Sequence, residues 1–455
     1  MQVKKLFLGL MFLSLMVVHA QKITWISTTD SVRWHKHESV KMTKVVVEIN
    51  DSAIVIDGLH KAQQITGWGG CFNELGWKAL QVLDENDRAE VMKSLFDQKE
   101  GSRFNICRTP MGASDFALDA YSYDDHPNDY EMKQFSIERD KKTLIPFIKA
   151  AMKYSPKLTV WASPWSPPAW MKTNNRYDSG SLKMEPKILN AYALYQEKYV
   201  QEYQKAGVPL VAIHVQNEPI YQTKYPSCQW LKADSMRDYI KYYLGPKFRE
   251  DKVPAQIWLG TITNFDTGWF KKILDDKEAA SYISGLGLQY RSSKVLSFLR
   301  RNYHYPMMET ETICFNGKNT WKESEDTYGL MCSYLKGGCQ AYMYWNMVLD
   351  ETGKSTWGWS QNSSVVVNTK NKTYQFTPQF YVMKHFSSFV TPGAYLITQT
   401  KDNRNAICFQ NPNGSMVVIV ANKEVSKKKF SIAIGESSFT AELDAKSFNT
   451  FLVEQ

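Results

Sequence analysis

Short apolar runs alternate with segments of helical spacing along most of the chain. Apolar residues three or four apart, such as the series Tyr192, Tyr195, Tyr199 and Tyr203, predict helices that pack against a sheet. Such helices are predicted at residues 84–96, 143–154, 188–206, 236–248, 269–279, 294–301 and 378–389, and another ends at residue 335. The runs between them predict strands at residues 104–108, 158–162, 210–215, 256–260, 285–290, 306–311 and 340–345. About eight strand–helix alternations predict an α/β fold, a (β/α)8 TIM barrel.

A glycine-rich segment, residues 65–74, precedes this series. Gly67, Gly69 and Gly70 lie in it within four positions. No lysine or helix follows at the spacing of a phosphate-binding loop. The segment is therefore predicted to be a tight bend from a strand to a loop.

Both ends of the chain have a different pattern, with a period of two. Residues 23–55 are strand-like, with 45–49 the clearest run, and residues 417–421, 430–434 and 448–453 are further predicted strands. Because chain termini often lie close together, both ends are predicted to build one β-sandwich side domain beside the barrel. The predicted organisation is a signal peptide at 1–20, sandwich strands at 21–60, the catalytic barrel at 61–390 and the rest of the sandwich at 391–455.

The first residues have the pattern of an export signal. Lys4 and Lys5 precede an apolar run at residues 6–18, and His19-Ala20 offers a small residue for cleavage. The run is too short to span a bilayer comfortably, and no later segment is apolar enough to do so. We therefore expect an exported protein without a membrane span: periplasmic, cell-surface or secreted.

Composition narrows the class of protein. Hydrophobic residues make up 43% of the chain and charged residues 22%, which is typical of a globular protein. The net charge is +9, but its densest cluster, Lys423 with Lys427–Lys429, is best explained as a solvated strand edge, and no nucleic-acid-binding motif accompanies it. The 7 cysteines are irregularly spaced without a C-x-x-C pair, which argues against a zinc site. Most are expected to be buried thiols, and the sequence does not decide whether one or two disulfides form.

Polar and aromatic residues stand where the predicted strands end. The strand at 210–215, for example, runs directly into Gln216, Asn217 and Glu218. Because strand ends of a barrel converge on one face, the side chains there should line one pocket. These residues are Asp115, Trp165, Asn217, Glu218, Gln289, Tyr290, Glu309, Glu311, Trp345 and Asn346.

The chemistry of this set favours a neutral, polyhydroxylated ligand. Carboxylates bind hydroxyl groups, and tryptophan faces stack on the C–H surfaces of sugars. No carboxylate–histidine spacing indicates a metal, and no G-x-S-x-G elbow indicates a serine hydrolase. Two carboxylates on separate strands are the minimum apparatus of a glycosidase, which needs no cofactor.

Several ordered motifs resemble glycoside hydrolase family 30, which includes lysosomal glucosylceramidase and microbial β-1,6-glucanases. They are Trp68-Gly-Gly, Arg108-Thr-Pro-Met with Asp115-Phe, Ala162-Ser-Pro-Trp-Ser-Pro-Pro-Ala-Trp-Met-Lys-Thr-Asn, Asn217-Glu-Pro, Thr310-Glu and Tyr344-Trp-Asn. The resemblance covers nearly all of the chain after the signal. It implies a barrel with a β-sandwich side domain and hydrolysis with retention of anomeric configuration.

The resemblance also implies roles for individual residues. Glu218 would be the general acid/base and Glu311 the nucleophile, while Asn217 would hydrogen-bond the sugar 2-hydroxyl. Asp115, Trp165 and Trp345 match positions that hold the terminal glucose. Glu309, two residues before Glu311 and on the same side of a strand, is a rival nucleophile.

Substrate specificity is expected in loops near the cleft. Where glucosylceramidase-like members carry His-Trp-Tyr, this chain has Gln289-Tyr290. Together with Met308-Glu-Thr-Glu and Thr356-Trp-Gly-Trp-Ser-Gln-Asn, this change resembles the β-1,6-glucanase branch. Trp357 and Trp359 would flank the cleft and stack further glucose units. We therefore expect a β-1,6-glucan substrate, with glucosylceramide or another β-glucoside as the alternative. A catalytically inactive glycan-binding protein is the alternative from another class, and the sequence makes no prediction of oligomeric state.

Overall fold

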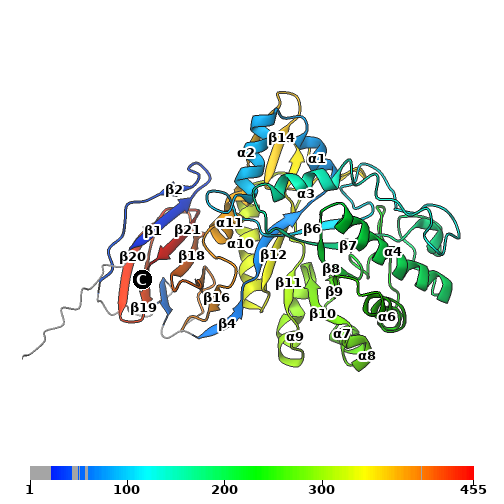
Figure 1. The fold of residues 1–455 in the computed structure, drawn as a ribbon. Coiled ribbons are helices and arrows are strands. Elements are labelled where there is room, and N and C mark those ends of the chain that lie inside the picture. The colour runs from blue at the N-terminus through cyan, green and yellow to red at the C-terminus, as the bar shows by residue number, and fades with distance from the viewer. Residues whose placement is uncertain (1–21, 44–49, 51, 57–59, 401, 455) are drawn as a thin grey trace, which may run out of the picture.

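The computed structural model describes residues 22–43, 50, 52–56, 60–400 and 402–454. It consists of a closed barrel and a β-sandwich lying at one side of it (Figure 1). The predicted signal peptide and the predicted strand at 45–49 lie outside the described residues. Within the described ranges, no helix has the length and apolar character needed to cross a membrane.

Eight parallel strands close the barrel, which confirms the predicted fold class. Each follows the previous one around the barrel, and β12 closes it by pairing with β5. The strands are β5 (Gly67–Cys71), β6 (Ile106–Met111), β7 (Thr159–Pro164), β8 (Leu210–His214), β9 (Gln256–Ile262), β10 (Ile283–Leu288), β11 (Met307–Glu309) and β12 (Ala341–Asn346).

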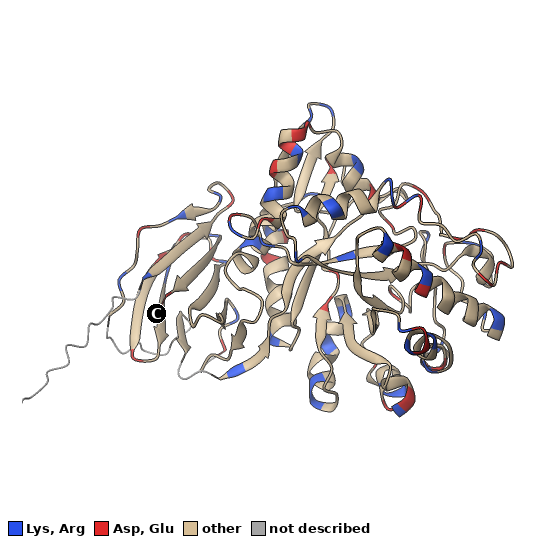
Figure 2. Cartoon of the chain, in the orientation of Figure 1, with Lys and Arg blue, Asp and Glu red and all other residues tan. Residues whose placement is uncertain are grey.

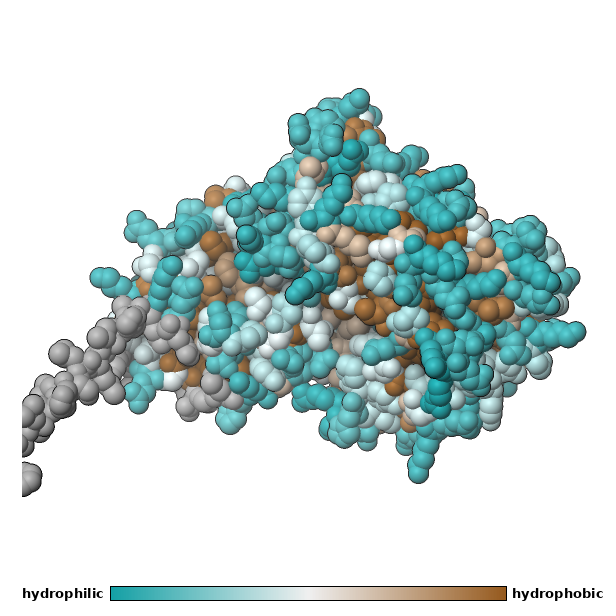
Figure 3. Space-filling model, in the orientation of Figure 1, coloured by the Kyte–Doolittle hydropathy of each residue, from teal (hydrophilic) through white to brown (hydrophobic). Residues whose placement is uncertain are grey.

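Helices surround the strands and bury their apolar sides on them. The outer layer comprises α1 (Glu74–Leu80), α2 (Glu85–Phe96), α3 (Leu144–Met152), α4 (Pro186–Lys205), α5 (Ala233–Tyr239), α6 (Gly245–Glu250), α7 (Thr267–Leu274), α8 (Lys277–Ala280), α9 (Leu296–Asn302), α10 (Trp321–Lys336) and α11 (Pro378–Ser387). The predicted tyrosine series lies on α4, where Tyr192, Tyr195, Tyr199 and Tyr203 are fully buried. Figure 2 shows lysines and arginines mingled with acidic residues on the helices and loops around the barrel, and Figure 3 shows a mostly hydrophilic surface in the same view.

The glycine-rich segment is a barrel strand, β5, and its prediction as a bend was wrong. A Cβ at Gly69 would lie 1.8 Å from the carbonyl oxygen of Ile106, and one at Gly70 would lie 2.4 Å from the Met347 side chain. The neighbouring chain therefore approaches too closely for any side chain, so the strand lacks the apolar run by which strands are recognised.

The side domain is built from both chain ends, as predicted. One sheet has the order β2 (His35–Lys36), β1 (Ile23–Thr28), β21 (Ser447–Val453), β18 (Met416–Asn422), β17 (Ala406–Gln410), β16 (Tyr395–Ile397) and β4 (Lys61–Gln64). The other comprises β20 (Ser437–Leu443), β19 (Lys428–Ile434) and β3 (Ala53–Ile56). Because β4 pairs with β16, the chain passes from sandwich to barrel after Gln64 rather than at residue 61.

Two local features differ from the sequence expectations. The lysine cluster opens β19, which is the middle strand of its sheet and not an edge, and Lys427 forms an ion pair with Asp444 at 2.9 Å. The connection from β12 to α11 carries an unpredicted three-stranded sheet of β13 (Val348–Asp350), β14 (Val365–Asn368) and β15 (Thr373–Phe376). This small sheet packs beside α1 and α2 at the top of Figure 1.

Candidate active site

Glu218 follows β8, and its backbone is held by both neighbouring strands. The amide of Asn217 donates to the carbonyl oxygen of Pro164 on β7 at 2.8 Å, and the amide of Glu218 donates to that of Thr261 on β9 at 3.0 Å. Glu218 itself has a φ of +45°, in the left-handed region. This conformation costs a residue with a Cβ on the order of 1 kcal/mol, and such strain concentrates at functional sites.

Two side chains position the half-buried Glu218 carboxyl. The amide Nε2 of Gln289 donates to Oε1 at 3.0 Å, and the hydroxyl of Tyr225 donates to Oε2 at 3.1 Å. Burial, and next the negative charge of Glu311, raise the pKa of Glu218 to about 7, although the two hydrogen bonds act in the opposite direction. Near neutral pH this carboxyl can therefore both hold and release a proton.

Glu311 follows β11 and is 5% exposed. The Nη1 of Arg108 lies 2.6 Å from its Oε2, and the hydroxyl of Tyr290 donates to its Oε1. Burial raises the pKa of Glu311, whereas the Arg108 charge and the Tyr290 hydrogen bond lower it. The pKa of Glu311 lies above its usual value overall, but the Arg108 charge favours its ionised form, and the negative charge of Glu311 favours the protonated form of Glu218.

Arg108 connects several parts of the site from within β6. Its side chain is fully buried, and besides Glu311 it donates to Ser163 Oγ at 3.0 Å and to Asn217 Oδ1 at 2.6 Å. Its guanidinium lies 4.3 Å from the ring centre of Trp165. Arg108 was not predicted to be a residue of the site. The signal was present, because a charged residue inside an apolar strand requires a buried partner.

Asn217 has only one end of its amide engaged by described residues. Its Oδ1 accepts from Arg108 and, at 2.7 Å, from the hydroxyl of Thr261. Both acceptor positions are thus used, and no described residue accepts a hydrogen bond from its Nδ2. The amide orientation is fixed with the NH2 group free to donate to a ligand, as a sugar hydroxyl would require.

Asp115, Trp165 and Trp345 form one wall of the site. The two indoles stack with ring centres 5.3 Å apart, and both are almost completely buried. Asp115 Oδ1 and Trp345 Nε1 are buried without a partner among the described residues. Burial, and next the charges of Glu311 and Glu218, raise the pKa of Asp115 well above its usual range. Unpartnered buried polar groups are rare in proteins, and here an acceptor and a donor occur together.

Gln289 and Asn346 are held by the protein at both ends of their amides. Gln289 donates to Glu218 and accepts from the hydroxyl of Thr310 at 3.1 Å. Asn346 donates to Gln361 at 2.7 Å and accepts from Asn73 at 3.1 Å. Both lie at the site, and their contacts are those of supports for neighbouring groups.

Trp357 and Trp359 lie in the segment between β13 and β14. Trp359 packs on Tyr225 with ring centres 5.0 Å apart, and Tyr225 in turn donates to Glu218. Trp357 lines a cavity of about 450 Å³ together with Tyr177 and Lys224, from the loops that follow β7 and β8. The segment therefore adjoins Glu218 through Tyr225. Tyr225, in an irregular loop, carries no sequence signal that predicts its role.

Glu309 does not share the orientation of Glu311, and the prediction that both point the same way was wrong. Its two carboxyl oxygens accept from the backbone amides of Glu311 and Met343, both at 3.2 Å. The strand ends at Glu309, so the alternation of side chains no longer applies two residues later. Glu309 is fixed in the protein interior, and its burial raises its pKa well above the usual range.

The described cysteines and acidic residues form neither a disulfide nor a metal site. All seven cysteines belong to the described part of the chain, and each is a buried free thiol. Over the same ranges, no group of three or more histidine, cysteine or acidic side chains is arranged to hold a metal ion.

A parallel eight-stranded barrel with two carboxyl groups at the carboxyl ends of its strands is the arrangement of a glycoside hydrolase. The family model described as "Glycosyl hydrolase family 30 TIM-barrel domain" matches residues 65–390, and that described as "Glycosyl hydrolase family 30 beta sandwich domain" matches residues 393–451. The chain belongs to glycosyl hydrolase family 30 and is a glycoside hydrolase.

Relatives of two kinds are similar to the chain. It is 30% identical to "Putative glucosylceramidase 3" of Caenorhabditis elegans, over 83% of this chain and 77% of that protein. It is 24% identical to "Endo-1,6-beta-D-glucanase" of Neurospora crassa, over 80% of this chain and 79% of that one. The solved structure of "The endo-beta1,6-glucanase BT3312" superimposes with a TM-score of 0.83 at 22% identity, over 95% of this chain and all of the other, which supports the fold.

Proposed function

We propose that the chain is an exported, retaining β-glucoside hydrolase in which Glu218 is the acid/base and Glu311 the nucleophile. The observation that carries this proposal is the contrast between the two carboxyls. Glu311 is paired with the buried cation Arg108 at 2.6 Å, whereas Glu218 has only neutral donors around it and a pKa raised to about 7. Export rests on the signal pattern at residues 1–20.

Hydrolysis would proceed in two displacements. In the first, a carboxylate oxygen of Glu311 attacks the anomeric carbon, the glycosidic C–O bond breaks, and the proton of Glu218 moves to the departing oxygen. In the second, Glu218 takes a proton from water, the water oxygen attacks the same carbon, and the bond to Glu311 breaks. Two inversions give retention, which requires carboxyls about 5–5.5 Å apart.

The proposed substrate is a β-1,6-linked glucan, cleaved internally. Trp359 beside the Tyr225–Glu218 pair offers an aromatic face for a further sugar unit. The cavity next to Trp357 is lined by charged and polar groups, including Arg176, Asp178 and Lys224, which suits a hydroxyl-rich chain better than a lipid tail. The similarity to a fungal endo-1,6-β-glucanase supports the same substrate.

Glucosylceramide is the second candidate. Identity to a putative glucosylceramidase reaches 30%, higher than to the glucanase. Phe265 and Ile313, on the loops after β9 and β11, are 48% and 37% exposed. Such apolar side chains on the catalytic face could contact a ceramide tail.

Azide tests the roles of the two glutamates with an activated aryl β-glucoside as substrate. In Glu311→Ala, azide should replace the nucleophile and yield the α-glucosyl azide by a single inversion. In Glu218→Ala, azide should intercept the glycosyl–enzyme and yield the β-glucosyl azide. The anomeric proton coupling in NMR distinguishes the products, and the β-azide from Glu311→Ala would refute the assignment. If the wild-type chain were an inactive glycan-binding protein, it would not hydrolyse the aryl β-glucoside.

Substrate choice is tested by following product lengths from soluble β-1,6-glucan. A mixture of oligosaccharides early in the reaction is expected from internal cleavage. Release of glucose from glucosylceramide, with no products from the glucan, would establish the second candidate instead.

A further inference from the structure

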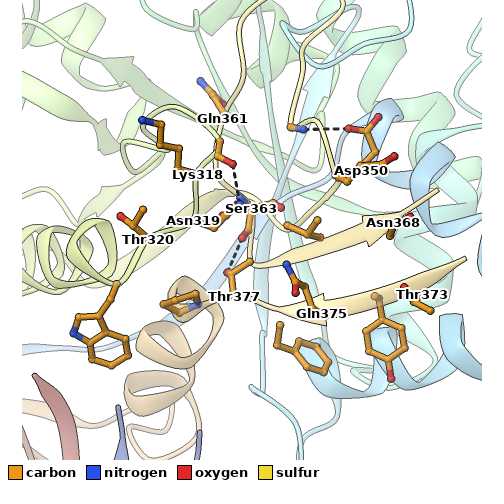
Figure 4. A pocket seen from close by; sticks show the side chains of 18 of the residues that line it. Lys318, Asn319, Thr320, Asp350, Gln361, Ser363, Asn368, Thr373, Gln375 and Thr377 are labelled. Carbon is orange, nitrogen blue, oxygen red and sulfur yellow. Dashed lines mark hydrogen bonds between the residues drawn. The ribbon is translucent and has the colours of Figure 1, made fainter. Parts of the chain in front are cut away.

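A cavity of about 690 Å³ lies outside the catalytic centre, between the small sheet, the start of α10 and the sandwich. This volume lies in the range of about 300–1,000 Å³ typical of small-molecule sites. Figure 4 shows polar side chains around it, with Asn319, Ser363 and Thr377 joined by hydrogen bonds on one side. This cavity, called here the junction pocket, is not used by the mechanism above.

One side of the junction pocket is a face of the β14–β15 hairpin. Val366 pairs with Gln375, and Asn368 pairs with Thr373, so these four side chains point to the same side of the ladder. All four line the pocket, whereas the alternate residues Val365 and Val367 are buried. The hairpin thus presents amide and hydroxyl groups to the pocket over two cross-strand pairs.

Hydrogen-bonding groups on the wall are left without protein partners. The indole Nε1 of Trp321 is buried with no partner among the described residues. Gln361 accepts from Asn346 through its Oε1, and no described residue accepts from its Nε2. Gln375 is exposed, and no described residue bonds its amide group. The two glutamine amides and the Thr373 hydroxyl form a set of donors and acceptors available to a ligand, whereas the Trp321 Nε1 is covered by the protein.

The charged groups of the pocket are mostly engaged with the protein. Arg33 lies 2.9 Å from Asp30, and both carboxylate oxygens of Glu351 accept from Thr369. Asp350 Oδ1 accepts from the amides of Thr352 and Gly353. An anionic ligand would meet three carboxylates against two cations, Arg33 and Lys318, and a lipid tail would bury unpaired amides. A neutral, hydroxyl-rich ligand satisfies the wall at the least electrostatic cost.

The junction pocket is connected to the catalytic face through one loop. Gly353 and Gln361, joined by a hydrogen bond at 2.8 Å, close the base of this loop and line the pocket. The residues between them include Trp357 and Trp359, and Trp359 packs on Tyr225 beside Glu218. Gln361 also holds Asn346 at the end of β12. A saccharide in the pocket would therefore bind to the base of the loop whose tip contacts the substrate.

We propose that the junction pocket is a second, non-catalytic binding site for neutral saccharide, recognised through Gln361, Thr373 and Gln375. The class of ligand rests on the proposed function, because the polysaccharide that the enzyme is proposed to cleave is the neutral saccharide that it would encounter. The site would hold the enzyme on its polymer while the cleft acts on another part of it.

Calorimetry with short β-1,6-linked glucan oligosaccharides tests the proposal in the Glu311→Gln background, where binding is measured without hydrolysis. Two sites are expected per chain. Adding Thr373→Val and Gln375→Ala, two exposed positions of the hairpin that line the pocket, should weaken one site roughly tenfold through two lost hydrogen bonds and leave the other unchanged. Lys370→Ala is the matched control, because Lys370 is exposed on the same hairpin and does not line the pocket.

Each outcome has a distinct meaning. A single binding site that the double substitution does not affect overturns the pocket proposal and leaves the proposed function intact. Absence of turnover of β-1,6-glucan by the wild-type enzyme refutes the proposed substrate instead, and β-1,3- and β-1,4-linked oligosaccharides then serve as probes of the pocket. If none of these loses affinity in the double variant, the pocket is not a saccharide site. Hydrolysis of an aryl β-glucoside should be equal in wild type and in the double variant without Glu311→Gln.

Discussion

Replacing Tyr225 by Phe isolates one hydrogen bond to the proposed acid/base and should shift the pH dependence of catalysis. The Tyr225 hydroxyl donates to Glu218 Oε2 at 3.1 Å and lowers the pKa of that carboxyl. Loss of the hydroxyl should therefore raise the pKa. Because Glu218 must be protonated to act as an acid, activity falls as the pH rises through this pKa. The alkaline limb of the pH–activity profile should therefore move to higher pH in Tyr225→Phe.

The size of the pKa shift follows from how much more strongly the Tyr225 hydroxyl binds the ionised than the protonated form of Glu218. A hydrogen bond to a charged group contributes about 1.5–3 kcal/mol and one to a neutral group about 0.5–1.5 kcal/mol. The difference is roughly 1 kcal/mol, and one pH unit corresponds to about 1.36 kcal/mol. From a wild-type limb near the Glu218 pKa of about 7, the Tyr225→Phe limb should therefore move upward by roughly half to one pH unit.

The assay is kcat/KM against pH, which reports the groups of the free enzyme. An alkyl β-glucoside, whose leaving oxygen needs the proton, should show the shift. A dinitrophenyl β-glucoside needs little protonation and should show a weak alkaline limb in both enzymes. Tyr221→Phe, on the same loop, is the control and should leave the limb in place. An unchanged limb in Tyr225→Phe, or a movement to lower pH, would refute the assignment of Glu218 or of its hydrogen bond.

Three further substitutions test other parts of the site. Arg108→Met should lower the free energy of unfolding by about 3–5 kcal/mol in denaturant titrations, because it leaves a buried carboxylate unpaired, whereas Arg176→Met, which breaks an exposed pair, should change it by less than about 1 kcal/mol. Glu311→Gln should reduce kcat roughly 10³-fold or more, while binding of gluco-oligosaccharides survives in calorimetry. Glu309→Gln should keep most of the activity. The reverse result would make Glu309 the nucleophile. Trp359→Ala should reduce kcat/KM for β-1,6-glucan roughly tenfold and that for an aryl β-glucoside much less, and equal losses on both would argue against a further sugar at Trp359.

Most barrel strands were predictable because strands buried on both faces carry continuous apolar runs. β5 could not be predicted, because its glycines are required by the close approach of a neighbouring strand. A Cβ at Gly69 would lie 1.8 Å from the carbonyl oxygen of Ile106, and this contact arises only when β6 lies beside β5 in the folded protein. The small sheet escaped prediction for a different reason. Its strands span three or four residues each, too few for a period of two to stand out from a loop.

Within the site, residues that end strands could be predicted, whereas a supporting residue in an irregular loop could not. Asn217 and Glu218 interrupt an apolar run, which marks them in the sequence. Tyr225 approaches Glu218 through an irregular loop, and its partner is decided by the path of that loop. The distinction between Glu309 and Glu311 depends on where β11 ends, and strand boundaries are the least certain part of a sequence-based prediction.

The charge balance of the site explains why the two glutamates differ although both are shielded from water. One buried cation, Arg108, can neutralise one carboxylate, and its Nη1 lies 2.6 Å from Glu311. A second ionised carboxyl would be an uncompensated charge next to Glu311, so Glu218 and Asp115 have raised pKa values. The centre therefore approaches neutrality with one ion pair and with protons on Glu218 and Asp115. A neutral sugar would enter without an electrostatic penalty, and the proton of Glu218 would be available to the leaving oxygen.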